Sequence, residues 1–175
     1  ADLVHVVAAA AYDRGAILVE VNWTDDELTL ARFRHAPRDS FEEFPTWRSD
    51  AMVAAAKRGD AFLSLRGTDP ALLKDEDPAL VTTVQRVQAE NTREYLTYIT
   101  SHQVNWCVLS VPIPSWAQRI FPDADDAVES LWGAIANACR LNAADPVAAW
   151  DQHLEQLARR AARLTTTAYD ALRFT

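Results

Sequence analysis

The side chains that most often bind metals or carry protons are scattered along this sequence. None of the four histidines, His5, His35, His102 and His153, has a second histidine three or four residues away. That spacing would let two imidazoles on one helix face share a zinc ion. His153 and Glu155 are two residues apart and lie on different faces of a helix. The histidines are therefore predicted to be structural or solvated.

Three short acidic groups, at 25–27, 123–126 and 75–77, are the other candidate cation ligands. The first two precede predicted helices, where negative charge stabilises the positive end of the helix dipole. The third resembles a calcium loop only in its charge, because it lacks the alternating ligands and the central glycine. No metal site is expected at any of them.

The cysteines Cys107 and Cys139 both lie in apolar stretches. A nucleophilic cysteine needs an adjacent base and a lowered pKa, whereas Trp106 and Val108 beside Cys107 are apolar. Both cysteines are expected to be reduced core residues of a cytoplasmic protein. A disulfide between them remains an open alternative.

Three strands are predicted, at 17–23, 61–67 and 106–111, separated by helical segments long enough for crossovers. Such strands form a parallel sheet with right-handed connections. Their carboxyl ends meet at one edge, where α/β proteins place their sites. The residues expected there, lining a cavity or a domain interface, are Asn22, Trp23, Arg66, Thr68, Pro114 and Trp116. An ordinary role as loop and capping residues is an equally open alternative.

The stretch 104–122 is predicted to form a buried strand, a turn and a helix capped by Ser115 and Gln118. Further capping boxes and X-Pro starts place the remaining helices. Their expected ranges are 2–14, 24–35, 45–59, 78–102, 124–141 and 146–164. In the last of them, apolar residues recur at spacings of three and four, which predicts a core-facing seam of Val147, Trp150, Leu154, Leu157, Ala161 and Leu164.

The fold class expected from this order is α/β, with a three-layer, mainly parallel open sheet and helices on both faces. The helix at 2–14 has no strand before it, so a preceding strand is expected outside this sequence. The net charge of −8 argues against nucleic-acid binding. No apolar run is long enough to span a membrane, and no signal peptide is expected at the start.

Several motifs, in order and in register, resemble the amino-terminal part of the aminopeptidase T / AmpS / PepS family of dinuclear metallo-aminopeptidases. The similarity runs from about Ala8 to Thr175. Its most specific pieces are PSWAQRIFP, at Pro114–Pro122, and DPVAAW, at Asp145–Trp150. The other matching segments are VNWTDDEL, RHAP, FEEFPTW, AFLSLRGTDP, LWGAIANACRLNAADPVAAWDQHLEQL and YDALRF.

The resemblance implies an amino-terminal α/β domain at 1–171, incomplete at both ends relative to the full enzyme. Residues 172–175 would begin the link to a carboxy-terminal catalytic domain. In this family the metal ligands lie in that second domain, so no catalytic or metal-binding residue is expected in this chain. Two divalent ions (Zn, Co, Mn or Mg) would act in the full enzyme on a peptide substrate.

The chain would then be a non-catalytic domain that forms part of the wall of the enzyme's cavity and contributes contacts to the family's homodimer. A different hypothesis is a free-standing α/β binding module without peptidase activity. A third is an unrelated enzyme that acts through loops containing Asn22, Arg66 and Ser115.

Overall fold

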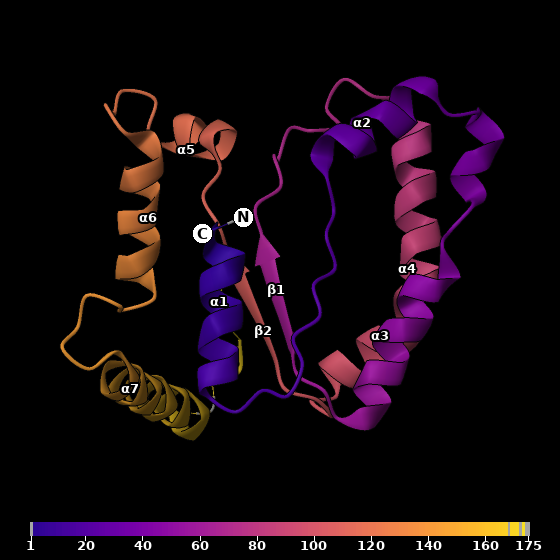
Figure 1. The fold of residues 1–175 in the computed structure, drawn as a ribbon. Coiled ribbons are helices and arrows are strands. Elements are labelled where there is room, and N and C mark those ends of the chain that lie inside the picture. The colour runs from indigo at the N-terminus through magenta and orange to yellow at the C-terminus, as the bar shows by residue number, and fades with distance from the viewer. Residues whose placement is uncertain (1, 168, 172, 174–175) are drawn as a thin grey trace.

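The structure, a computed structural model, describes residues 2–167, 169–171 and 173 (Figure 1). The strand bounds are β1 Phe62–Arg66 and β2 Trp106–Ser110. The helices are α1 Asp2–Asp13, α2 Asp26–His35, the 3-10 helix η1 Arg38–Glu42, α3 Thr46–Arg58, α4 Pro78–Thr100, α5 Pro114–Ile120, α6 Ala127–Ala138 and α7 Pro146–Thr167. The predicted link at 172–175 lies outside the described residues, except for 173.

The two strands pair in parallel, from Phe62 opposite Trp106 to Arg66 opposite Ser110. Helix α4 forms the crossover between them. In Figure 1 the strands lie between α3 and α4 on one side and α5 and α6 on the other. The predicted α/β class with parallel strands is confirmed.

The prediction of a strand at 17–23 is wrong for this structure, because the segment is irregular from Ala16 to Asp25. It has the composition of a strand, but a strand exists only where its backbone groups find partners in a ladder. Among the described residues, no backbone hydrogen bond joins this segment to β1 or β2.

Two predicted helix starts differ from those observed. Asp25, not Thr24, caps α2, and its side chain accepts a hydrogen bond from the backbone N–H of Leu28 at 2.9 Å. Helix α5 begins at Pro114, with Ile113 in the cap position, so Ser115 lies inside the helix rather than at its cap. Proline suits the first helical position because it has no N–H to leave unpaired.

One group of buried residues lies around η1 and α4. Phe41 is 1% exposed, and Ala56 of α3 and Val87 of α4 are buried too. The ring of Phe33 meets that of Phe41 edge-on at 5.1 Å. Phe41 therefore packs η1 against α2, and η1 also contacts α4.

A second apolar cluster joins α5 to α6. Ala117 is fully buried, and Ala127 and Leu131 complete its centre. Trp116 and Phe121 pack against it, together with Val128 and Ile135. Trp116 is therefore partly buried by packing against this cluster.

Much of the predicted core is exposed. In β2, Val108 is 51% exposed and Cys107 is exposed too, which contradicts the expectation of a strand covered on both faces. The predicted seam of α7 is also exposed at Val147, Leu154, Leu157 and Leu164. Both cysteines are free thiols.

The accessible surface quantifies this openness. The chain exposes 13453 Å², whereas a compact monomer of 19.5 kDa exposes roughly 8,500 Å². Parallel sheets are ordinarily covered by helices on both faces. Some of the apolar residues that the sequence pattern assigned to a core, such as Val108 and Leu154, therefore lie exposed.

Candidate functional site

The carboxyl ends of β1 and β2 converge immediately before α5. The backbone N–H of Val111 donates to the carbonyl of Arg66 at 2.7 Å, which extends the ladder past the end of β2. Gly67 then passes close to the start of α5, since a Cβ built on it would lie 3.2 Å from Cγ2 of Ile113. This close approach explains a residue without a side chain at position 67.

The start of α2 reaches the same edge through Asp26. The backbone N–H of Asp69, in the loop after β1, donates to Oδ2 of Asp26 at 3.3 Å. The Asp69 carboxylate accepts a hydrogen bond from the backbone N–H of Ala71 at 2.9 Å, which stabilises a turn after β1. Sequence reasoning assigned Asp26 only a helix-dipole role, because a contact across 43 residues leaves no local pattern.

The predicted site residues lie on three segments that meet here. Asn22 and Trp23 are exposed just before α2, and Trp23 is 58% exposed. Arg66 and Thr68 are exposed at the end of β1. Pro114 is exposed at the first residue of α5, while Trp116 is half-buried against the α5–α6 cluster. A role for these six residues in lining a cavity or a domain interface stays a prediction.

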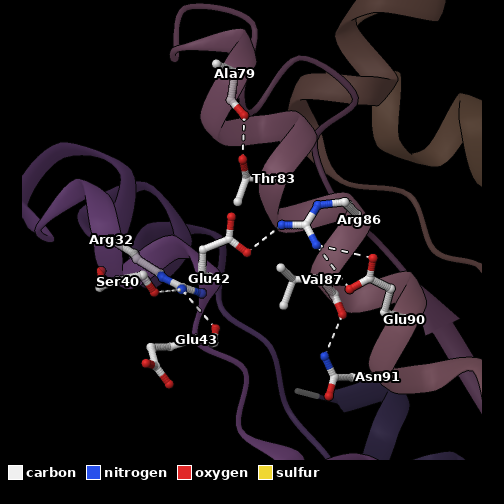
Figure 2. Close-up of polar contacts among 10 residues, drawn as sticks. All are labelled: Arg32, Ser40, Glu42, Glu43, Ala79, Thr83, Arg86, Val87, Glu90 and Asn91. Carbon is white, nitrogen blue, oxygen red and sulfur yellow. Dashed lines mark hydrogen bonds and ion pairs between the residues drawn. The ribbon is translucent and has the colours of Figure 1, made fainter.

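A polar network joins α2 to η1 and η1 to α4 (Figure 2). The Arg32 guanidinium donates to the backbone carbonyls of Ser40 at 2.9 Å and Glu43 at 3.2 Å. It also lies over the Phe41 ring, 4.9 Å from the centroid. One side chain thus satisfies carbonyls at the end of η1 and stacks on its buried aromatic.

Arg86 on α4 forms the second half of the network. Figure 2 shows its guanidinium between the carboxylates of Glu42 on η1 and Glu90 on α4. Hydrogen bonds to Glu42 and then Glu90 hold the pKa of Arg86 above its ordinary value. These groups are solvent-exposed, so the network orients η1 more than it stabilises the fold.

Two further ion pairs connect helices on the same side of the sheet. Arg38 pairs with Asp77, the cap of α4. The backbone N–H of Ala79 and then Arg38 lower the pKa of the Asp77 carboxyl. Lys57 on α3 lies 2.9 Å from a carboxylate oxygen of Glu94 on α4. These ion pairs connect helices, and they do not place a nucleophile beside a base.

Burial is the main influence on the pKa of Tyr95 in this region. Tyr95 of α4 packs edge-on against Phe62 of β1, with ring centroids 5.1 Å apart. Desolvation raises the pKa of the Tyr95 phenol. The phenol is therefore neutral at pH 7 and serves to pack α4 on the sheet.

The turn between α6 and α7 carries a polar arrangement that the sequence did not reveal. Trp150 Nε1 donates to the carbonyl of Cys139 at 2.9 Å, and the Arg140 guanidinium lies 4.6 Å from the centroid of a Trp150 ring. Arg140 has a φ of +58°, which suits the tight end of a helix. A shallow hollow beside this turn is lined by Asn137, Arg140, Asn142, Ala143, Ala149, Gln152, His153 and Gln156.

The residues that the structure describes do not form a metal centre. Across 2–167, 169–171 and 173, no group of three or more His, Cys, Asp or Glu side chains converges closely enough to hold a metal ion. No chemical step through a metal can therefore be assigned to these side chains. None of the helices in the described ranges is both long enough and apolar enough to cross a bilayer.

Comparison with known proteins identifies the family. The sequence model of the family described as thermophilic metalloprotease (M29) matches residues 1–175. This chain belongs to the M29 metallopeptidase family. The resemblance expected from the sequence motifs is confirmed.

Individual M29 relatives match almost the whole chain. Aminopeptidase 2 from Geobacillus stearothermophilus is 41% identical over 161 residues, covering 91% of this chain and 39% of its own length. Aminopeptidase T from Thermus thermophilus is 34% identical over 175 residues, covering 99% of this chain and 43% of its own length. This M29 chain therefore spans about two fifths of the curated relatives it matches.

A solved M29 structure shares the fold. Wild-type AmpT from Thermus thermophilus superimposes with a TM-score of 0.82 at 33% sequence identity. The match covers 93% of this chain and 41% of that chain. The arrangement of helices and strands described above is therefore that of one part of an M29 aminopeptidase.

Proposed function

We propose that this chain is the non-catalytic amino-terminal domain of a metal-dependent aminopeptidase, which removes amino-terminal residues from peptides. Membership of the M29 family carries the proposal. The relatives named as aminopeptidases are more than twice as long as the segment matched here. The rest of the polypeptide would supply the metal ligands, because the described side chains form no metal-binding group.

The large exposed surface supports a scaffolding role. The chain exposes 13453 Å², which exceeds the roughly 8,500 Å² of a compact monomer by about 5,000 Å². Interfaces between domains bury about 600–1,500 Å² and large obligate interfaces about 2,000–5,000 Å² in total, so more than one interface would be needed to cover it. The catalytic domain and a second subunit of a homodimer are the partners proposed to cover it.

Within this role, the carboxyl edge of the sheet is the proposed wall of the peptide cavity or of the domain interface. Asn22, Trp23, Arg66 and Thr68 are exposed on segments joined by the Asp26–Asp69 hydrogen bond. Exposed tryptophan offers a large apolar face for a peptide or a neighbouring domain.

Aminopeptidase assays on two proteins test the proposal. The 175-residue chain and the full-length product of its gene would each be incubated with aminoacyl p-nitroanilides and Zn²⁺, Co²⁺, Mn²⁺ or Mg²⁺. We expect hydrolysis by the full-length product only, and its loss on chelation, because two divalent ions would activate the attacking water. Amide hydrolysis by the 175-residue chain would disprove its non-catalytic role.

One further outcome of these assays would favour the alternative function. A full-length product that binds peptides but hydrolyses none with any of these metals would favour a binding module.

Fractionation of the source cells tests the proposed cytoplasmic location, and recovery of the protein with membranes would contradict it.

A further inference from the structure

The hollow beside the α6–α7 turn is lined mainly by hydrogen-bond donors. Its volume of about 340 Å³ lies at the lower end of the range for small-molecule sites. Apart from Ala143 and Ala149, every lining side chain carries an N–H group; these are Asn137, Arg140, Asn142, Gln152, His153 and Gln156. A polar hollow of this size suits a small ligand that accepts hydrogen bonds.

The charge of the hollow favours an anion. No Asp or Glu is among the described residues that line it. Asp151 and Glu155 line a separate hollow, which shares only Ala149 and Gln152 with this one. The acidic and basic groups at the start of α7 therefore lie on different sides of the helix. Arg140 supplies a positive charge to one side, in a chain whose net charge is −8.

The Arg140 side chain is held in place by two contacts. Its Cζ lies 4.6 Å from the centroid of a Trp150 ring, and its Nη1 donates to the Ala138 carbonyl at 3.3 Å. Trp150 is itself fixed, because its Nε1 donates to the Cys139 carbonyl at 2.9 Å. The His153 ring meets the indole edge-on, with centroids 5.6 Å apart. A guanidinium oriented in advance loses little freedom when it binds an anion.

A capping role accounts for only part of this arrangement. The contact with Ala138 uses one of the five N–H donors of the Arg140 guanidinium. Among the residues that the structure describes, Arg140 forms no ion pair with a carboxylate. Asp145 lies nearby in sequence, but its carboxylate caps α7 by accepting from the Ala148 N–H at 3.0 Å. A half-buried guanidinium lacks a counter-charge here, and a bound anion would supply it.

We propose that this hollow binds the oxyanion group of a small molecule, a carboxylate or a phosphate. The planar fork of Arg140 matches two oxygens of either group. The side-chain amides of Asn142, Gln152 and Gln156 would donate to the remaining lone pairs. The inference concerns the α6–α7 turn and does not depend on peptidase activity.

Calorimetric titration of the full-length gene product tests the site, with sodium acetate in one series and inorganic phosphate in the other. Chloride keeps the ionic strength constant, which removes general screening effects. We expect saturable binding of at least one anion, with a Kd of about 1 mM, because the site is shallow and offers a few charge-assisted hydrogen bonds. Binding of acetate alone assigns the site to carboxylates, and binding of phosphate alone assigns it to phosphates. Absence of saturable binding in both series would overturn the proposal.

Variants show whether the anion binds at this turn. Arg140→Lys keeps the charge but loses the fork, so it should raise the Kd about tenfold. Arg159→Lys makes the same exchange on α7 outside the hollow and should leave the Kd unchanged. A metal centre elsewhere in the full-length product would bind either anion without regard to Arg140. Equal Kd values in the wild type and Arg140→Lys would therefore contradict the proposal, as would equal weakening by both variants.

A second variant separates binding from folding, because Arg140 also contacts the end of α6. Gln152→Leu removes one amide donor from an exposed helical position and leaves the contacts of Arg140 with Trp150 and Ala138 intact. It should raise the Kd severalfold with little change in melting temperature. An unchanged Kd in Gln152→Leu would remove the hollow as the binding site, even where Arg140→Lys weakens binding.

Discussion

The backbone N–H of Asp69 donates to the carboxylate of Asp26 at 3.3 Å, across 43 residues of sequence. This hydrogen bond fastens the first turn of α2 to the loop that follows β1. Asn22 and Trp23 lie just before Asp26 in the sequence, and Arg66 and Thr68 lie just before Asp69. We expect the predicted site at this edge to depend on this hydrogen bond.

Removing the acceptor should loosen this edge. Asp26→Ala is expected to lower the free energy of unfolding of the 175-residue chain by about 1 kcal/mol, because a charged acceptor is lost. Glu27→Ala is the matched control, since it removes a carboxylate from the same helical turn and should cost about 0.3 kcal/mol through the helix dipole. Urea denaturation measures both. Equal effects would mean that the Asp69 hydrogen bond adds no stability.

Trp23 is expected to contact the peptide or the neighbouring domain. In the full-length enzyme, Trp23→Ala should change the ratio of kcat/KM for a pentapeptide to that for a dipeptide severalfold, because remote binding energy is used in the transition state. Trp47→Ala is the control, since Trp47 is also exposed but lies on α3. An identical ratio in wild type and both variants would remove Trp23 from the proposed cavity wall.

Trp116 is expected to combine packing with a role at the same edge. Because its side chain packs on the α5–α6 cluster, Trp116→Ala should lower the free energy of unfolding by about 2 kcal/mol. In the full-length enzyme it should also alter peptide-length preference. Thermal melts and steady-state kinetics separate the two effects. A stability loss with unchanged kinetics would leave Trp116 a packing residue only.

The Asp77 carboxylate should make the free energy of unfolding depend on pH. Its pKa is lowered in the folded protein by the Ala79 N–H and Arg38. The associated stability is therefore present above its ordinary pKa of 3.8 and is lost as the pH falls through the folded value. Asp77→Asn keeps a capping oxygen but cannot titrate.

Urea midpoints between pH 7 and pH 2 would test this dependence. The wild-type chain should lose more stability than Asp77→Asn as the pH falls below about 5. Asp75→Asn, two residues earlier on an exposed turn, should follow the wild type. Parallel curves for the wild type and Asp77→Asn would contradict the linkage.

Two glycines are expected to respond to alanine in opposite directions. Gly59 ends α3 with a φ of +82°, so Gly59→Ala should destabilise by about 1 kcal/mol even though the site is open. Gly133 lies inside α6, with open space at its Cβ position. Gly133→Ala should stabilise the 175-residue chain by about 0.5–1 kcal/mol, because alanine favours helix. Denaturation curves that shift in the same direction for both would refute this assignment.

The sequence predicted those helix starts and ends that are determined by residues close to them in the chain. Asp77-Pro78 predicts the start of α4, and Gly59 the end of α3, because caps and left-handed glycines act within a few residues. The parallel pairing of β1 with β2 also follows from the helical crossover between them. Motif order likewise predicted the family, since aligned segments retain their spacing.

Tertiary structure alone decided which apolar residues are covered. Val108 and the seam of α7 carry core patterns but lie exposed, because burial depends on what packs against a face and not on the face itself. Ile17–Trp23 has the composition of a strand and is not one, because a strand needs a hydrogen-bonded neighbour that its own residues cannot supply. The Asp26–Asp69 hydrogen bond was likewise decided only by the tertiary structure, because folding brings together residues that are 43 positions apart in the sequence.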